Sequence, residues 1–162
     1  MDNNAADFIK IVRHPFKFRF FLFSKLPAAF FSGVRVRDID ESKCVVSVPF
    51  KWLTQNPFRS TYFASLSMAA EMSTGALALA NIYKRNPPVS MLVVKVESEY
   101  FKKAIEKTFF TCNDGQLFYN AVEESIKSGE GQIVKAKSIG LNQKGEVVAE
   151  FFVTWSFKAK TN

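Results

Sequence analysis

Histidine is nearly absent from this chain, where His14 is the only one. A zinc site built on several histidines is therefore excluded. A Ser–His–Asp or Cys–His arrangement would have to use His14, which precedes a proline in a phenylalanine-rich stretch and is poorly placed as an oriented base. Cys44 and Cys112 are too few for a disulfide framework, and the seven glycines form no GxGxxG or GxxxxGK phosphate loop. Any catalysis must then rest on carboxylates, amides, hydroxyls and backbone dipoles.

Length and charge narrow the class of protein further. At 162 residues the chain is predicted to form one domain with its own core. The formal charge of +7 favours anionic partners, but no RNA-binding aromatic signature or recognition helix is visible, so no nucleic acid is expected as a partner. Basic residues interrupt every apolar stretch near the N-terminus, so no secretory signal is predicted. With only two cysteines, we expect a reduced, cytoplasmic protein.

Phenylalanine is unusually abundant, with 18 in the chain and many of them in the basic segment 8–31. Pro15 and Pro27 predict one or two short helices broken at those points. These helices could pack their rings on the body of the protein or make peripheral contact with an anionic membrane. The cations are scattered rather than set on one clean face, which favours packing. We therefore expect residues 1–32 to form a helical segment packed on the domain.

Most of the remaining chain is predicted to be β-strand. Residues 34–40 alternate, turn at 41–43 and return over 44–50, which is typical of an antiparallel hairpin. Further strands are predicted at 89–101, 107–112, 132–141 and 146–158. In the first of these, Leu92, Val94, Val96 and Tyr100 occupy alternating positions. A helix capped by residue 113 or 114 and ending at Gly129 is expected between the second and the third.

One carboxylate stands out in the segment Ser60–Tyr83, where Glu71 is the only charge among small and apolar residues. Ser60 is a candidate N-cap, and Lys84 and Arg85, followed closely by two prolines, stop the segment, so a long helix over about 60–84 is predicted. Its length permits a membrane span, but Glu71 and many hydroxyl and amide side chains favour a soluble core helix. A buried carboxylate is costly unless it is paired or does chemistry. Glu71 is therefore either a structural residue held by a backbone N–H or a lysine, or a catalytic residue.

The order of elements predicts an α+β domain. No repeat or low-complexity linker divides the chain, so residues 1–162 are expected to form a single domain with one antiparallel sheet. The central helix is rich in Ala, Ser, Thr and Gly, whose small side chains let a backbone come close to whatever covers it. A curved antiparallel sheet wrapped around this helix is the expected architecture.

This arrangement resembles the hot-dog fold. The residues that carry the resemblance are Asn56, in the loop before the helix, and Glu71, fifteen residues later. In hot-dog acyl-CoA thioesterases of the phenylacetyl-CoA type, a loop Asn or Gln and a helix Asp or Glu occur at similar spacing. Residues 56–60 and 69–75 also resemble a domain family of unknown function placed in that superfamily. The His-Gly-Gly step usual in these thioesterases is replaced here by residues 62–64, Tyr-Phe-Ala, whose rings could fill the acyl slot.

The resemblance implies thioester hydrolysis with acyl-CoA as the substrate and without a cofactor or metal. Glu71 would act as general base on a water or attack the carbonyl itself, and Asn56 would hold that water or the substrate carbonyl. The backbone N–H of Phe63 or a neighbour would stabilise the oxyanion. Burial among Ala and Met side chains is expected to raise the pKa of Glu71.

Other residues complete the predicted substrate site. Tyr62 and Phe63 would contact the acyl group, while Thr74 and Ser90 would supply supporting hydroxyl groups. The resemblance also implies a homodimer or a dimer of dimers, in which the Asn56 loop of one chain serves the helix glutamate of the other. Cations at the mouth of the site would bind the CoA phosphates, and the candidates are Arg59, Lys84, Arg85, Lys102, Lys103, Lys135 and Lys137.

Two other functions compete with hydrolysis. The missing Gly-Gly step and the aromatic pair at 62–63 favour a non-catalytic acyl-CoA- or lipid-binding hot-dog protein in which Glu71 is structural. Hydration or dehydration of an acyl thioester is less favoured, because related hot-dog enzymes rely on a histidine with an acid and His14 is badly placed.

Overall fold

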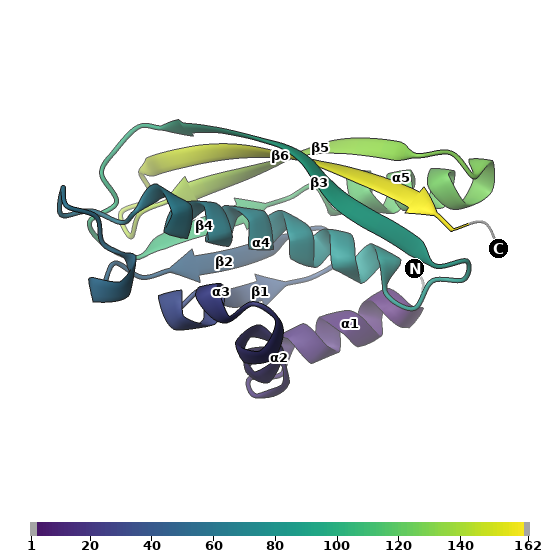
Figure 1. The fold of residues 1–162 in the computed structure, drawn as a ribbon, viewed down its shortest axis with the longest axis horizontal. Helices are drawn as coiled ribbons and strands as arrows, with labels where there is room; N and C mark the ends of the chain where they lie inside the picture. Colours follow the sequence, from purple (N-terminus) through teal and green to yellow (C-terminus); the bar gives the residue numbers. More distant parts are fainter. Residues whose placement is uncertain (1–2, 161–162) are drawn as a thin grey trace.

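The computed structural model describes residues 3–160, so residues 1, 2, 161 and 162 of the predicted single domain lie outside the description. Within this range a curved antiparallel sheet wraps a long central helix, α4 (Figure 1). The helices are α1 (Asn3–Arg13), α2 (Lys17–Lys25), α3 (Pro27–Ser32), the short 3-10 helix η1 (Trp52–Thr54), α4 (Phe63–Ile82) and α5 (Gly115–Ser128). The strands are β1 (Arg35–Ile39), β2 (Cys44–Val48), β3 (Val89–Tyr100), β4 (Thr108–Cys112), β5 (Gln132–Leu141) and β6 (Val147–Ala159). The predicted α+β class and the wrapped helix are confirmed.

The sheet has the strand order β1-β2-β4-β5-β6-β3, so β1 and β3 form its two edges. Strand β6 supplies much of the core, because alternate side chains point toward α4. Phe151, Val153, Trp155 and Phe157 are buried on that face, as the sequence predicts. Phe151 packs edge-on against Phe110 of β4, with ring centroids 5.6 Å apart. This aromatic layer fixes the sheet against the central helix.

Helix α4 is shorter than predicted at both ends. It begins at Phe63 after the extended residue Tyr62, and no side chain caps it, so the predicted N-cap role of Ser60 is wrong. It ends at Ile82, because Lys84 adopts a left-handed backbone conformation with φ 52°. By length and composition α4 could cross a membrane, but most of it is buried inside the fold. Its apolar length therefore serves the core.

Strand β3 contains a bulge that the sequence does not reveal. The pairing with β6 shifts between Val93 and Lys95, so the alternation of side chains changes face at that point. Leu92 lies on the outer face, whereas Val96 pairs with Val153 and faces inward. The predicted alternation of Leu92 and Val96 on one face is therefore wrong. At the sheet edge, Val96 is still 49% exposed despite its inward position.

The β1–β2 hairpin and helix α5 meet at a close backbone contact. The Gly115 N–H donates a hydrogen bond to the Ser42 carbonyl oxygen (3.0 Å). A Cβ atom at position 115 would lie 1.9 Å from the Glu41 carbonyl oxygen, so only glycine fits there. Asp114 precedes the helix as predicted, but its carboxylate accepts a hydrogen bond from the Lys137 N–H (2.6 Å) instead of capping α5.

The two cysteines lie opposite each other inside the sheet. Cys44 of β2 and Cys112 of β4 form a directly facing pair, and both are free thiols with no exposed surface. Burial raises the pKa of both, that of Cys112 to about 12. A thiol that stays protonated is a poor nucleophile, so neither cysteine is a catalytic candidate.

The N-terminal segment forms three helices instead of the predicted one or two, with breaks near Pro15 and Pro27. Helices α1 and α3 contact α4, so the segment packs on the domain as expected. The packing uses only some of its rings. Phe8 and Phe18 are buried, whereas Phe16 and Phe20 are largely exposed. In Figure 1 the dark-coloured helix α2 forms an outer corner of the molecule.

Candidate active site

Glu71 lies in the middle of α4 and borders a small cavity of about 60 Å³. Every other residue that lines this cavity is apolar or aromatic. The N-terminal segment contributes Phe8, Phe18, Phe21 and Leu26, α4 contributes Met72, Gly75, Ala76 and Leu79, and the sheet contributes Met91 and Trp155. The cavity therefore surrounds one carboxylate with hydrocarbon.

The Glu71 carboxylate has no partner that would neutralise it. Within residues 3–160 no hydrogen bond or ion pair reaches its oxygens. The alternative that Glu71 is a structural residue held by a lysine or a backbone N–H is therefore not supported. Burial raises its pKa, as the sequence predicts, because desolvation disfavours the charged form. A raised pKa makes this carboxylate a stronger base than an ordinary glutamate.

Gly75 makes room for this carboxylate one turn further along α4. A Cβ atom at position 75 would lie 3.0 Å from Glu71 Oε1 and 3.3 Å from Trp155 Cζ2. Glycine inside a helix costs about 1 kcal/mol relative to alanine. The space that it leaves lets the carboxylate lie along the helix surface beside the Trp155 ring.

Thr74 holds the same region together. Its hydroxyl donates to the Glu71 carbonyl oxygen (2.9 Å) and accepts the indole N–H of Trp155 (3.0 Å). Thr74 is fully buried, so its hydroxyl cannot contact substrate directly. It is a positioning residue that fixes the Trp155 ring at the edge of the Glu71 cavity.

Replacing Thr74 with valine is expected to lower the free energy of unfolding by about 1–3 kcal/mol, because the buried indole N–H of Trp155 loses its acceptor. Valine keeps the shape of threonine, so packing is preserved. Denaturant unfolding followed by tryptophan fluorescence measures the change. Thr74→Ser retains the hydroxyl and is the control; equal losses in both variants would show that packing, not this hydrogen bond, sets the stability.

Asn56 lies in the loop before α4, where its amide is used within the loop. Its Oδ1 accepts the N–H of Phe58 (3.0 Å) and of Ser60 (3.2 Å), and its Nδ2 donates to Ser60 Oγ (3.1 Å). These bonds form a local turn of the kind that Asn side chains favour. Asn56 therefore shapes the loop, and within one chain it does not line the Glu71 cavity.

A second, open cavity of about 600 Å³ lies at the N-terminus of α4 and includes Asn56, Tyr62 and Phe63. The two rings pack edge-on with centroids 4.8 Å apart, and both remain about half exposed. The first helical hydrogen bonds come from the N–H groups of Ser65 and Leu66 to the Tyr62 carbonyl. The preceding N–H groups of Phe63 and residue 64 are therefore available as donors at the helix start.

The predicted site residues fall in separate places within one chain. Phe63 precedes Glu71 by eight residues, which is about 12 Å along a helix. Ser90 lies on the opposite face of β3 from Met91, which lines the Glu71 cavity, and its hydroxyl donates to the Lys158 carbonyl (3.0 Å). Ser90 is thus not beside Glu71.

Most cations predicted to bind phosphates are engaged in ion pairs. Lys102 pairs with Glu146 (2.5 Å), Lys135 with Glu97 (2.8 Å), Lys137 with Glu150 (3.0 Å) and Arg85 with Glu123. Lys103 lines the open cavity beside Lys102 and forms no ion pair with residues 3–160. Of the seven candidates, Lys102 and Lys103 are the ones that lie at a cavity with predicted site residues.

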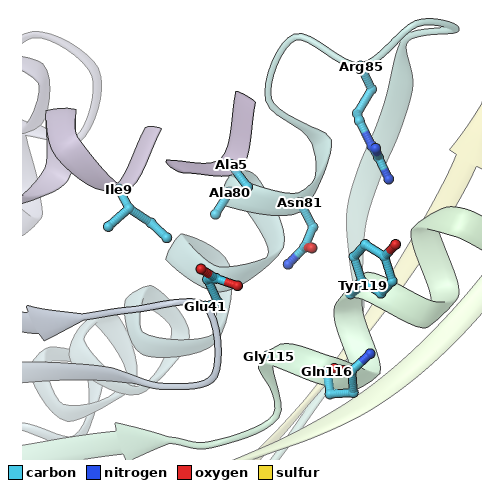
Figure 2. A pocket seen from close by; sticks show the side chains of 9 residues that line it. All are labelled: Ala5, Ile9, Glu41, Ala80, Asn81, Arg85, Gly115, Gln116 and Tyr119. Atoms are coloured by element: carbon cyan, nitrogen blue, oxygen red, sulfur yellow. The ribbon is translucent and has the colours of Figure 1, made fainter. Parts of the chain in front are cut away.

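A further cavity of about 240 Å³ lies at the other end of α4 (Figure 2). It brings together α1, the hairpin turn, the end of α4 and the start of α5, with Glu41, Asn81, Arg85 and Tyr119 among its lining residues. The Asn81 amide nitrogen donates to the Leu77 carbonyl (2.9 Å). No group of three His, Cys, Asp or Glu side chains suited to a metal occurs within residues 3–160.

Comparison with known proteins identifies the family of this chain. A family model for a domain of unknown function, DUF4442, matches residues 18–156. The chain belongs to the DUF4442 family. No curated protein matches the sequence. The match includes Asn56 and Glu71, so both residues belong to the DUF4442 domain, whereas α1 lies before it.

Solved structures show the fold of this DUF4442 domain. A Pseudomonas aeruginosa protein of unknown function, described as a probable thioesterase, is similar at 19% identity with a TM-score of 0.75, over 90% of this chain and 97% of that one. A Chlorobaculum tepidum protein of unknown function gives 15% identity and a TM-score of 0.75, over 89% and 93%. A thioesterase from Haemophilus influenzae gives 11% identity and a TM-score of 0.63, over 88% and 89%. The hot-dog fold predicted from the sequence is confirmed.

The residues that sequence reasoning missed are those of the N-terminal segment that close the Glu71 cavity. Phe18, Phe21 and Leu26 reach it from α2 and the start of α3, and Phe8 reaches it from α1. The abundance of phenylalanine before residue 32 was the available signal. It predicted that the segment packs on the domain but not where, because basic and apolar residues are mixed around α2 and leave no single apolar face.

Proposed function

We propose that the protein hydrolyses an acyl thioester, with acyl-CoA as the substrate and Glu71 as the catalytic base or nucleophile. The observation that carries the proposal is the unpaired Glu71 carboxylate in an apolar cavity, with its pKa raised by burial. As a base, Glu71 would take a proton from water while the water oxygen attacks the thioester carbonyl carbon. The C–S bond then breaks, and the proton passes to the leaving thiolate to give the free thiol.

The start of α4 supplies the second element of the proposal. The tetrahedral intermediate places negative charge on the carbonyl oxygen, and backbone N–H groups at a helix N-terminus stabilise such charge. The N–H of Phe63 is available there beside the open cavity. Lys103 at the rim of the same cavity would attract the phosphates of CoA.

A homodimer would bring these two elements together. Strand β3 is twelve residues long and, among residues 3–160, pairs only on its β6 side, which leaves an open edge. Val96 and Tyr100 face inward there yet remain 49% and 45% exposed. Such an edge is normally covered in a native protein. We propose that a second copy covers it and that its Asn56 loop and α4 start then lie beside Glu71. The two buried thiols are consistent with action in the cytoplasm.

Thiol release from short, medium, long and aromatic acyl-CoAs tests the proposed reaction. We expect saturable turnover with at least one of them, and a preference that follows acyl size, because the cavity beside Glu71 is small. Acyl-CoA in buffer without protein is the control. Absence of turnover with every acyl-CoA, in a protein that still binds one of them, would overturn hydrolysis.

Mixing two inactive variants tests the shared site. Glu71→Gln and Asn56→Ala homodimers are unfolded together and refolded so that subunits exchange. If each site combines Glu71 of one chain with the Asn56 loop of the other, random pairing restores about a quarter of wild-type activity, since half of the dimers hold one intact site. A site contained in one chain would give no recovery. Light scattering after size-exclusion chromatography checks the dimer independently.

The runner-up function is non-catalytic acyl binding, and the cavity volume favours it. About 60 Å³ beside Glu71 accommodates a few water molecules and no long acyl chain. In that case an acyl-CoA would bind at the open cavity by α4 and remain intact. Calorimetric binding together with mass spectrometry of the recovered ligand separates the two functions.

A further inference from the structure

The net charge of the molecule is concentrated in one segment. Residues 8–37 contain seven basic residues and no acidic one. The rest of the chain holds the remaining 15 basic residues and all 15 acidic ones, so it is neutral on balance. The basic residues of the segment are Lys10, Arg13, Lys17, Arg19, Lys25, Arg35 and Arg37. The full excess of +7 therefore lies on residues 8–37, which run from α1 through α2 and α3 into β1.

The same segment exposes aromatic rings to solvent. Phe16 is 79% exposed, Phe20 71%, Phe23 50% and Phe31 54%. The first three are spaced by four and three residues, so they share one face of the α2 region. Phe23 contacts the ring of Phe31 with centroids 6.2 Å apart, and both contact Phe30. We call these four exposed rings the aromatic patch.

A basic groove of about 440 Å³ adjoins the aromatic patch, between α1, α2 and the edge strand β1. Its lining includes Arg13, His14, Arg19, Arg35 and Arg37, with Asp38 as the acid among them. Asp38 is already paired with Arg13 (3.8 Å) and Lys43 (3.1 Å). Arg35 has no acidic partner within residues 3–160. Unneutralised guanidinium groups in a groove are the usual means of binding phosphate.

Two contacts join the groove to the aromatic patch. The His14 ring lies 6.4 Å from the ring of Phe16, centroid to centroid. The Arg19 guanidinium lies 4.1 Å from the centroid of Phe30, whose ring contacts Phe23 and Phe31 of the patch. Burial and the charge of Arg35 lower the pKa of Arg19, which shows that the cations are close enough to repel one another. An anion in the groove would relieve this repulsion.

We propose that this face binds the surface of an anionic lipid bilayer. The rings of the aromatic patch enter the headgroup and upper acyl region, and the arginines of the basic groove contact lipid phosphates. A second copy of the chain does not fit this face, because an isologous contact would oppose the two sets of like charges. Helix α2, which carries the exposed rings of Phe20 and Phe23, lies at an outer corner of the molecule, where a broad surface can reach it (Figure 1).

Flotation with vesicles tests the proposal on the full chain. Phosphatidylcholine vesicles containing phosphatidylglycerol are expected to bind the protein, and pure phosphatidylcholine vesicles are not. Phe16→Ser/Phe20→Ser and Lys17→Glu/Arg35→Glu should each lower the vesicle partition coefficient roughly tenfold or more. All four residues are exposed, so the fold should be unaffected. Higher salt should weaken binding of the wild type.

Matched variants elsewhere on the surface make the test specific. Ile105→Ser/Leu117→Ser removes exposed apolar side chains, and Lys103→Glu/Lys144→Glu reverses exposed charges, both outside the aromatic patch and the basic groove. Both pairs should bind vesicles like the wild type. The proposal is wrong if the wild type does not bind anionic vesicles, or if the control variants lose binding as much as the patch and groove variants. It is also wrong if the Phe16→Ser/Phe20→Ser variant changes the oligomeric state on size-exclusion chromatography instead of vesicle binding. Thiol-release activity is not needed for any of these readouts, so a failed hydrolase proposal leaves the test intact.

Discussion

Glu71→Gln is expected to lower thiol release from acyl-CoA by at least about 100-fold, because a neutral amide can neither accept the proton from water nor attack the carbonyl. Glutamine has nearly the same size and shape as glutamate, so the contacts with Gly75 and Trp155 are preserved. The measurement is the turnover number with the preferred acyl-CoA, followed with a thiol-reactive dye. Glu124→Gln, an exposed glutamate on α5, is the matched control and should retain full activity.

The pH dependence provides a second signature of the same residue. Burial raises the pKa of Glu71 in the folded protein, whereas the unfolded chain ionises at the ordinary glutamate value. Activity should therefore rise with pH through the raised pKa as the base form appears. Between the two pKa values the folded state binds more protons, so stability should fall as pH increases across that window. The Gln variant lacks this decrease and should be at least as stable as wild type at neutral pH.

One result would contradict this account directly. If Glu71→Gln retained the wild-type turnover number and pH profile, Glu71 would not be the base. A Gln variant that lost both turnover and its cooperative thermal transition would simply be unfolded. In that case the conservative Glu71→Asp variant tests whether the carboxylate is catalytic. Aspartate keeps the charge but is one methylene shorter. A folded Asp variant with partial activity would support a catalytic carboxylate whose position matters.

Gly115→Ala is expected to lower the free energy of unfolding by about 3–5 kcal/mol, which puts it among the most damaging single substitutions. The added methyl group would lie 1.9 Å from the Glu41 carbonyl oxygen, and that atom belongs to backbone that cannot rotate away. The hairpin turn must separate from the start of α5, which breaks the hydrogen bond from Gly115 to Ser42. Thermal unfolding should shift downward by about 10 °C for a chain of this size.

Gly131→Ala is the matched control for this effect. A Cβ atom at position 131 would meet its nearest neighbour, the Phe157 carbonyl oxygen, at 3.9 Å, which is an ordinary contact. Its transition temperature should stay close to that of wild type. Similar shifts in both variants would mean that loss of glycine itself, and not the close contact at Glu41, is responsible.

The parts of the fold set by periodicity could be predicted from the sequence. Strand β5 occupies 132–141 as predicted, and the buried positions of β6 follow from strict alternation. The bulge in β3 could not be predicted, because residues 91–94 are apolar on both faces and only the pairing with β6 fixes the register. The start of α4 could not be predicted either, because Tyr62 is extended and no side chain caps the helix.

The candidate site was predictable only in part. Glu71 could be found because it is the one charge in an apolar helix, and the direction of its pKa followed from that context. The local turn that Asn56 forms could be expected from the Asn-Pro step, which favours a turn. The rings that close the cavity could not be assigned, because their positions depend on how three short helices pack on α4.

The facing thiols of Cys44 and Cys112 have a practical consequence for work on this protein. Both are fully buried where β2 pairs with β4, so a reagent that reacts with thiolates does not label the protein while the domain is folded. In an assay with a thiol dye, colour then reports only the CoA released. Under rising denaturant the same two groups become labelled as β2 and β4 separate. One reagent can thus measure released thiol while the protein is folded and the opening of the sheet when it unfolds.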